Sequence, residues 1–552
     1  MSDNVTLDMN YRFNERELTA LKDYGEIKTH SAGDVLYEVG DANVDLLVLL
    51  SGALNVYLIE DGEERRVGWL EPGQFTGDVS MITGQRSLVR ARMEEGGEVL
   101  HVSPASLQRL LVERSGLSDA LVNAFIARRA WARSAGRASV VLVGRAFDQQ
   151  AFSIRDLLTK HAVPHLWVEA DADPKAQTIL ERLNLTLDDT PVLVTGASST
   201  LVKPSLSDVS RDLGLDLLPD NACADVIVVG AGPAGLAASV YAASEGLSVV
   251  TLDATAPGGQ AATSSKIENY LGFPSGISGR DLADRANIQA QKFGARLAAP
   301  ATAEELTRAD DGTYGINLAD GRHVHGRAVV IASGAEYRDL PLDGIRQYRG
   351  RGIYYGATAM EAQLCTGSSV AIVGAGNSAG QGAVFLAENA KSVHVLYRRA
   401  DIRETMSEYL VRRLEETENI HLHPEVEIAA LNGDGERLRG LELKGPNGAT
   451  GALDTPFLFM FIGAAPCTDW LPQSVARDDK GFLKTGGAIE NVALVKAGWS
   501  LDRMPAIFET SWPRVYAVGD VRAGSVKRVA SGVGEGSVVV QYIHRALAEK
   551  PA

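Results

Sequence analysis

Short apolar runs that alternate with polar residues dominate the first hundred positions of the chain. From about residue 12 to 103, runs such as AGDVLYEVGD and LNVYLIEDGEERRVGWL are separated by glycine-containing turns. A period of two with frequent turn signals predicts an antiparallel β-roll. After the roll the apolar positions change to helical spacing and share one face: Leu117, Leu121, Val122, Phe125, Ile126 and Trp131. We therefore expect a first domain at about 12–134, made of a roll and helices.

A small α/β unit is predicted for residues 138–216. Its segments are SVVLVG, SIRDLLTKHA, HLWVEAD, PKAQTILERL, PVLVTG, TLVKP and LSDVSRDLG, in the order strand, helix, strand, helix, strand, strand, helix. From residue 223 onward, strands and helices alternate around two glycine-rich junctions, which predicts doubly wound parallel sheets. The segments 132–137 and 217–222 are interpreted as linkers.

Composition limits the classes of function. A chain of 552 residues is too long for one hydrophobic core, so several domains are expected. No apolar run reaches membrane-spanning length and the N-terminal segment is polar, which predicts a cytoplasmic protein without a membrane span. The net charge of −16 argues against nucleic acid as a partner. The three cysteines lie far apart and the histidines form no HxH or HxxxH set with acidic neighbours, so neither a disulfide framework nor a metal site is expected.

The first glycine-rich junction reads DVIVVGAGPAGLAASVYAASEGLSVVTLD. Gly230 suits the tight turn after a buried strand, and Gly232 lets backbone amides approach a pyrophosphate. Gly235 permits close packing of the helix on the strand. Asp253 ends the next strand, at the distance where a carboxylate can bind a ribose diol. Together these features predict a dinucleotide site.

The second junction reads SVAIVGAGNSAGQGAVFLAENAKSVHVLYRR. Gly374, Gly376 and Ala379 repeat the pattern, but the following strand ends in Arg398 and Arg399 instead of an acid. Guanidinium groups pair with the 2′-phosphate that a carboxylate would repel, so NADPH is favoured over NADH. In the alternative interpretation, one or both arginines only solvate the surface.

From Cys223 to the C-terminus the chain resembles the low-molecular-weight thioredoxin reductases. The motifs that carry the resemblance are, in family order, GAGPAG, PGGQAATSSKIENYLGFPSGISG, VVIASGA, GAGNSA with YRR, FIGAAP, VYAVGDV and VASGVGEG. The resemblance implies an FAD domain built from residues 223–344 and 463–552, with an inserted NADPH domain at 345–462. It also implies a homodimer.

The resemblance assigns cofactor contacts to individual positions. Those implied for FAD are Gly230, Gly232, Pro233, Ala234, Gly235, Asp253, Gly259, Gln260, Asn269, Ala332, Gly334, Gly519, Asp520, Arg528 and Val529. Those implied for NADPH are Gly374, Gly376, Asn377, Ser378, Ala379, Arg398 and Arg399. Where the family has Arg-Gln-Val beside the flavin ring, this chain has Lys527, Arg528 and Val529, and a cation near the ring favours reduced flavin.

The redox dithiol of the resembling reductases is missing. The family segment SYCATCDG corresponds here to YYGATAMEAQLCTG, which puts Gly356 and Ala359 in the places of the two cysteines. In these reductases the NADPH domain rotates so that the flavin meets the dithiol and the nicotinamide in turn. Cys365 lies nearest the vacated position and is the candidate reactive thiol, although Cys223, Cys365 and Cys467 each also fit the role of a small unpaired apolar residue.

The roll resembles cyclic nucleotide-binding domains through AGDVLYEVGD, LVLLSG and EPGQFTGDVSMITGQRSLVRA. The resemblance implies that amides around Gly77 and the side chains of Arg86 and Ser87 hold a cyclic phosphate. Asp78 stands where the family prefers glutamate for the ribose hydroxyl. In the alternative interpretation the roll binds no nucleotide and serves only to dock other domains.

The unit at 138–216 resembles a glutaredoxin or thioredoxin fold, with Thr190–Pro191 where that fold carries its cis-proline. The helix after GRAFDQQ has no CxxC, so the resemblance implies the architecture without the redox chemistry. We expect a structural or partner-docking role.

Three functions remain in competition. The first is an NADPH-dependent FAD oxidoreductase whose acceptor is a redox protein, a quinone or a small molecule, with a cyclic nucleotide as candidate regulator. The second is a non-catalytic sensor of flavin and nucleotide. The third is a thioredoxin reductase that uses Cys365 with a thiol from another chain.

Overall fold

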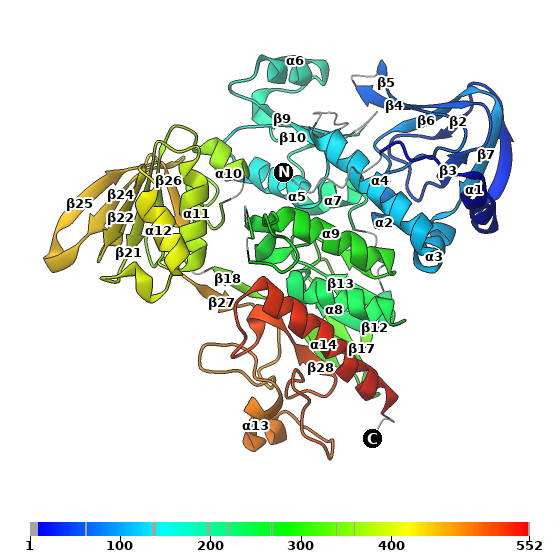
Figure 1. Cartoon of the computed structure of the whole chain (residues 1–552). Helices are drawn as coiled ribbons and strands as arrows, with labels where there is room; N and C mark the ends of the chain where they lie inside the picture. Colours follow the sequence, from blue (N-terminus) through cyan, green and yellow to red (C-terminus); the bar gives the residue numbers. More distant parts are fainter. Residues whose placement is uncertain are drawn as a thin grey trace.

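The strands and helices form four lobes, seen in Figure 1, and the lobe with the first glycine junction is built from two separated segments of the chain. The computed structural model describes residues 9–549 except 61–62, 135–139, 196–198, 217, 220, 265, 268, 338 and 358. No helix in these ranges is both long and apolar enough to cross a membrane.

The first lobe is an antiparallel roll. Its strands are β1 (Glu26–His30), β2 (Val35–Tyr37), β3 (Leu46–Leu49), β4 (Ala53–Glu60), β5 (Glu63–Leu70), β6 (Arg90–Glu95) and β7 (Gly97–Val102). They form two sheets, β1-β7-β3 and β2-β6-β4-β5. Its helices are α1 (Glu15–Leu21), α2 (Ser80–Thr83), α3 (Pro104–Glu113) and α4 (Ser115–Ser134). The predicted roll and its following helix are confirmed.

Helix α4 extends further than the sequence suggested. Residues 132–134, interpreted as the start of a linker, belong to its last turn, while 135–137 lie outside the described residues. The helix continues because Trp131 and Ala132 line a cavity of the roll. The second predicted linker is also shorter than expected, because Asn221 and Ala222 already pair with β17.

The thioredoxin-like unit has the predicted order of elements. It comprises β8 (Val140–Gly144), α5 (Gln149–Lys160), β9 (His165–Glu169), α6 (Pro174–Arg182), β10 (Val192–Thr195), β11 (Ser199–Val202) and α7 (Leu206–Leu213). The strands form one sheet in the order β11-β10-β8-β9, in which β8 and β9 are parallel. The Thr190–Pro191 peptide bond is cis, as predicted.

The central lobe holds the first glycine junction. Its sheet has the order β14-β13-β12-β17-β16-β15, with β28 added beside β17. The strands are β12 (Asn221–Val229), β13 (Val249–Leu252), β14 (Arg296–Ala298), β15 (Ala303–Arg308), β16 (Tyr314–Leu318), β17 (His323–Ile331) and β28 (Val515–Ala517). The helical segments are α8 (Pro233–Ser244), η3 (Gly259–Thr263), α9 (Gly279–Lys292), α13 (Asn491–Lys496) and α14 (Val529–Ala548). The doubly wound part is confirmed, and β15 and β16 add an antiparallel extension.

The second dinucleotide lobe follows a short two-stranded connection, β18 (Ala335–Tyr337) with β27 (Ala464–Pro466). Its parallel sheet has the order β19-β26-β20-β21-β22, and an antiparallel sheet has the order β23-β24-β25. The strands are β19 (Ile353–Tyr354), β20 (Ser369–Val373), β21 (Ser392–Tyr397), β22 (Ile420–Pro424), β23 (Glu427–Gly433), β24 (Leu438–Lys444), β25 (Thr450–Asp454) and β26 (Phe457–Met460). The helices are α10 (Ala359–Leu364), α11 (Asn377–Ala387) and α12 (Glu408–Glu416).

The two N-terminal lobes pack directly on the dinucleotide lobes: α2 and α3 of the roll contact α9, and α5 lies next to α10 (Figure 1). Phe152 of α5 lies with its ring centre 5.8 Å from that of Tyr354 on β19. Ile288 of α9 lies within the hydrophobic core of the roll. The accessory lobes are therefore continuous with the hydrophobic cores of the dinucleotide lobes.

Candidate functional site

The first junction has the shape that a dinucleotide phosphate needs. A Cβ on Gly230 would lie 2.2 Å from Ala332 O, and one on Gly235 would lie 1.8 Å from Gly230 O, so both positions require glycine. By contrast, a Cβ on Gly232 would meet only the Cα of Gly259, at 3.9 Å. Gly232 precedes α8, whose first turn begins at Pro233 and has no side-chain cap. The open helix N-terminus fits the FAD pyrophosphate.

Asp253 follows β13, beside this junction. Its Oδ2 accepts a hydrogen bond from Ala231 N at 2.8 Å, and its Oδ1 accepts from Thr255 N and Ala256 N, both at 3.0 Å. Burial raises the pKa of the Asp253 carboxyl, and the backbone donors oppose that rise. The carboxylate thus ties its own loop to the glycine turn, besides the predicted contact with a ribose.

Other predicted FAD residues lie on several segments of the same lobe. The side-chain amide of Gln260 donates to Ala335 O, while Asn269 is exposed on the loop after η3. Gly334 has a φ of +71° and no atom within 4 Å of an added Cβ. Gly519 has a φ of +73°, and its N–H donates to Glu535 at 2.7 Å.

A cationic segment lies at the start of α14. Arg528 is the exposed N-cap residue before Val529, with no side-chain cap bond. The Lys527 ammonium donates to Asp520 O and lies 4.5 Å from the ring centre of Phe482. Burial lowers the pKa of Lys527, and burial raises the pKa of the Asp520 carboxyl. The uncapped N-terminus of this 20-residue helix and the neighbouring cation suit electron-rich flavin atoms.

The second junction repeats the geometry. A Cβ on Gly374 would lie 2.4 Å from Phe461 O, whereas a Cβ on Gly376 would meet nothing within 4 Å. Helix α11 follows without a side-chain cap and begins with Asn377, whose Oδ1 accepts from Ser407 N at 2.8 Å. Ser378 and the buried Ala379 complete its first turn. This end of α11 fits a second pyrophosphate.

The two arginines after β21 differ in their availability. The Arg398 side chain is 82% exposed and its acidic partner, Glu427, is 3.9 Å away. Arg399 is 52% exposed and donates to Glu404 at 2.6 Å. Arg398 can therefore pair with a phosphate at little cost in free energy, whereas Arg399 must first break its ion pair with Glu404.

The vacated dithiol segment lies against the FAD lobe. Ala357 forms an isolated parallel bridge with Ser264, and a Cβ on Gly356 would lie 3.0 Å from the Cβ of Thr263 in the turn after Gln260. Ala359 begins α10. We call the turn at η3, Gly259–Thr263, the flavin loop. The segment that carries the dithiol in the resembling reductases thus contacts the flavin loop without bringing sulfur to it.

The three thiols are free, and Cys365 is poorly suited to reaction. It is fully buried, and its Sγ–H donates to Glu361 O at 3.1 Å. Burial raises the pKa of the Cys365 thiol to about 11, and burial raises that of Cys467 to about 11 as well. Because a thiolate is the reactive form, these values disfavour Cys365 as a redox thiol. Cys223 is exposed at the start of β12.

The roll encloses a cavity of about 210 Å³ beneath α4. Gly77, Asp78 and Ser87 line it, as predicted for a nucleotide site, together with aromatic rings such as that of Trp131. Arg86, predicted to hold the cyclic phosphate, does not line this cavity. It is exposed and turned outward because its Nη1 donates to Gly40 O at 2.8 Å.

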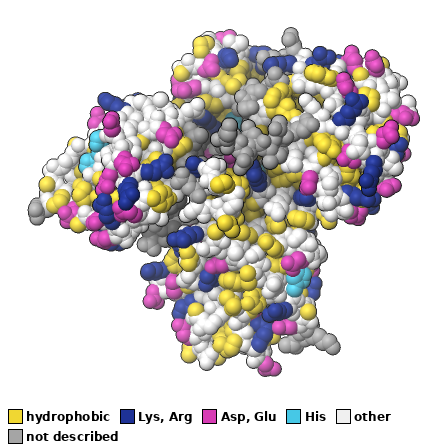
Figure 2. Space-filling model, in the orientation of Figure 1, with side chains coloured by type: hydrophobic (Ala, Val, Ile, Leu, Met, Phe, Trp, Pro, Cys, Tyr) yellow, Lys and Arg dark blue, Asp and Glu magenta, His cyan; other side chains and the backbone are white. Residues whose placement is uncertain are grey.

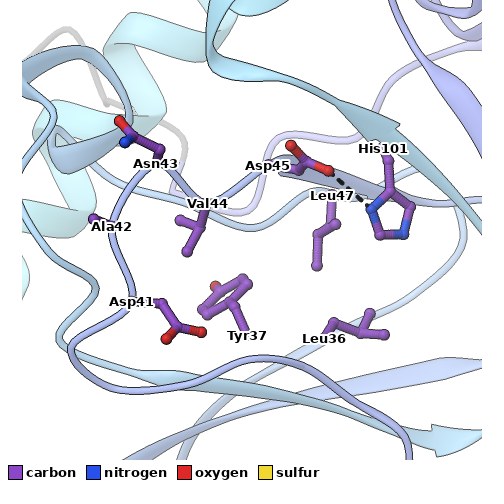
Figure 3. A pocket seen from close by; sticks show the side chains of 9 residues that line it. All are labelled: Leu36, Tyr37, Asp41, Ala42, Asn43, Val44, Asp45, Leu47 and His101. Carbon is purple, nitrogen blue, oxygen red and sulfur yellow. Dashed lines mark hydrogen bonds and ion pairs between the residues drawn. The ribbon is translucent and has the colours of Figure 1, made fainter.

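A second hollow of about 290 Å³ lies in the roll, around the segment between β2 and β3 (Figure 3). Asp45 and His101 face one another there, with 3.2 Å between Oδ2 and Nδ1. Asp41 also lines it, and none of its nine lining residues is lysine or arginine. Acidic side chains without a cation do not suit a phosphate, so the nucleotide prediction applies to the inner cavity.

Charged side chains of both signs are mixed over every lobe of the face shown in Figure 2. Within the described residues, no group of three or more His, Cys, Asp or Glu side chains is arranged to hold a metal ion. Sequence reasoning missed Thr263, which faces Gly356, and Glu535, which holds the Gly519 turn. The acid in VASGVGEG was a signal for Glu535, whereas nothing local marked Thr263.

Comparisons with known proteins agree with this geometry. The family model for pyridine nucleotide-disulphide oxidoreductases matches residues 224–536, and that for cyclic nucleotide-binding domains matches residues 27–114. A thioredoxin reductase of Bacillus subtilis is 28% identical over 326 residues, 59% of this chain and 95% of that protein. An NADPH-dependent thioredoxin reductase 3 of Arabidopsis thaliana is 30% identical, over 58% of each chain. The crystal structure of T. acidophilum thioredoxin reductase superposes with a TM-score of 0.52 at 28% identity, over 59% of this chain and 99% of that one.

Proposed function

Because the chain belongs to the pyridine nucleotide-disulphide oxidoreductase family, we propose that it oxidises NADPH through FAD and reduces an acceptor that needs no protein dithiol. FAD and NAD(P)H supply the hydride-transfer chemistry when bound. The observation that carries the proposal is the contact of Gly356 and Ala357 with the flavin loop. In the resembling reductases, the segment that corresponds to these residues carries the two sulfurs.

The chain's own residues bind and orient the two cofactors. The N–H groups at the starts of α8 and α11 would hold the two pyrophosphates, and Arg398 would pair with the 2′-phosphate of NADPH. The Lys527 ammonium adds positive charge near the start of α14. Gly356 and Ala359 bring no thiol to the flavin loop, so the acceptor is a redox protein, a quinone or another small molecule that takes electrons from the flavin itself.

A thioredoxin reductase that works through Cys365 fits less well. The thiol is buried, hydrogen-bonded to a carbonyl and has a raised pKa, so it supplies little thiolate. The predicted homodimer and the cofactor-contact assignments remain proposals that rest on the resemblance, and the cytoplasmic location remains a proposal that rests on the sequence pattern.

Anaerobic titration with NADPH tests the proposal. We expect one equivalent of NADPH to bleach the flavin absorbance near 450 nm, and a quinone to restore it in the same cuvette. The variant Gly356→Val places a side chain against Thr263, where even a Cβ would lie only 3.0 Å from the Cβ of Thr263. It should disturb this contact and slow reoxidation by the quinone, while leaving the NADPH-reducing step intact. A flavin that NADPH does not bleach would identify a non-catalytic sensor instead.

For the roll, we propose that the inner cavity binds a cyclic nucleotide that regulates the enzyme. The family match and the positions of Gly77, Asp78 and Ser87 support this ligand. To bind the phosphate, the Arg86 guanidinium must break its hydrogen bond to Gly40 O. Calorimetry on the full chain with cyclic AMP and cyclic GMP tests the proposal, and binding that Arg86→Ala leaves unchanged would place the phosphate elsewhere.

A further inference from the structure

A series of polar contacts leads out of the roll cavity into the thioredoxin-like unit. Asp78, in the cavity wall, accepts from Arg129 Nε at 2.6 Å. Arg129 Nη1 donates to Gln85 Oε1 at 3.1 Å and to Ala162 O at 3.2 Å. Ala162 follows α5 in the thioredoxin-like unit, so one guanidinium joins the wall of the cavity to the next lobe of the chain.

The series continues from that turn to the FAD junction. His161 Nε2 donates to Thr255 O at 3.4 Å. Thr255 N in turn donates to Asp253 Oδ1 at 3.0 Å, and Asp253 Oδ2 accepts from Ala231 N at 2.8 Å. Ala231 lies between the first two glycines of GAGPAG. The turn at residues 160–162 therefore contacts Arg129 of the roll on one side. On the other side it contacts the loop after β13 that carries Asp253 and Thr255.

Burial makes these contacts matter energetically. Arg129 is 4% exposed, and its charge is balanced by Asp78. Burial alone would raise the pKa of Asp78, but the Arg129 charge holds it below its usual value. His161 is 8% exposed, and burial lowers its pKa to about 4, so the neutral ring donates to Thr255 O. Polar groups removed from water cannot exchange their partners without cost.

We infer that Arg129 and His161 are positioning residues for FAD. Both residues lie outside the FAD lobe and hold in place the loop that carries Asp253. A ligand that binds Asp78 in the roll cavity, in place of Arg129, therefore changes the affinity of the protein for FAD. The thioredoxin-like unit thereby gains a role that requires no cysteine. The inference rests on the proposed FAD site, and linkage requires that bound FAD change the affinity of the roll for its ligand by the same factor.

The experiment measures FAD dissociation from the full-length holoenzyme on dilution, through the fluorescence of released FAD. We expect Arg129→Met and His161→Phe each to raise the dissociation constant about tenfold, which is about 1.4 kcal/mol. The double variant should raise the dissociation constant little further, because both substitutions interrupt the same series of contacts. His161→Gln, which retains an N–H donor, should stay within about threefold of the wild type.

The matched control is Arg128→Met. Arg128 is the neighbouring residue of α4 and lines the same cavity, but its hydrogen bonds to Met9 O and Gly77 O remain within the roll. We expect it to leave FAD binding within twofold of the wild type. Because Arg129→Met strands the Asp78 charge and can destabilise the fold, the pair Asp78→Asn with Arg129→Met is measured beside it, with circular dichroism to verify folding.

Three different results would overturn the inference. If folded His161→Phe and Asp78→Asn/Arg129→Met variants hold FAD as tightly as the wild type, the contacts are only structural. Equal weakening by Arg128→Met would also overturn it, since that result would show a general loosening of the roll. A wild type that retains no FAD would remove the proposed FAD site itself, and the inference with it.

Discussion

Replacing Arg398 with alanine should remove most of the preference for NADPH. The side chain is 82% exposed and its acidic partner, Glu427, is 3.9 Å away, so little is lost when it turns to a phosphate. A charge-assisted hydrogen bond contributes about 1.5–3 kcal/mol, which corresponds to roughly 10- to 150-fold in affinity. Arg399→Ala should have a smaller effect, because Arg399 must first leave Glu404.

The assay compares kcat/KM for NADPH and NADH with ferricyanide as artificial acceptor. The Arg398→Ala variant should lose NADPH efficiency while its NADH efficiency stays nearly constant. Arg439→Ala is the control, since this arginine lies in the same lobe, is 51% exposed and pairs with Asp434. An unchanged ratio of the two efficiencies in Arg398→Ala, or no preference in the wild type, would refute the reasoning.

Three further predictions concern the flavin, the thiols and stability. Gly232→Asp should yield a colourless protein, because a carboxylate at the open helix N-terminus repels the pyrophosphate; a full yellow spectrum would contradict the site. Ellman's reagent should modify exposed Cys223 quickly and buried Cys365 only after unfolding, and rapid reaction of both would show that Cys365 is accessible. The folded-state pKa of His161, about 4, lies below the unfolded value near 6.5, so the unfolded chain binds the proton first and stability falls as pH drops from about 6.5 to 4. Melting curves of His161→Phe should show a weaker pH dependence over this range, and an equal slope would count against the burial of the ring.

The glycine junctions could be predicted from sequence because their geometry leaves few alternatives. Gly235 would place a Cβ 1.8 Å from a carbonyl oxygen, so only glycine permits that approach of helix and strand. The order of elements in the thioredoxin-like unit followed from apolar periodicity in the same way. Local patterns report such features because the residues that decide them are neighbours in sequence.

Contacts between distant segments could not be predicted. Arg129 and Ala162 are 33 residues apart, and His161 and Thr255 are 94 apart, so no motif links them. The outward turn of Arg86 depends on the carbonyl of Gly40, 46 residues earlier. The predicted linker at 132–137 begins inside helix α4, because Trp131 and Ala132 line a cavity that the sequence does not reveal.

The most direct test of the central claim is turnover by a variant with all three cysteines replaced by serine. Stopped-flow reoxidation of the NADPH-reduced variant by a quinone should proceed within about threefold of the wild type, a barrier change of about 0.65 kcal/mol. Oxidised thioredoxin should reoxidise neither protein at a comparable rate. Loss of quinone turnover in the cysteine-free variant, or efficient reduction of thioredoxin by the wild type, would contradict a flavin that works without a protein dithiol.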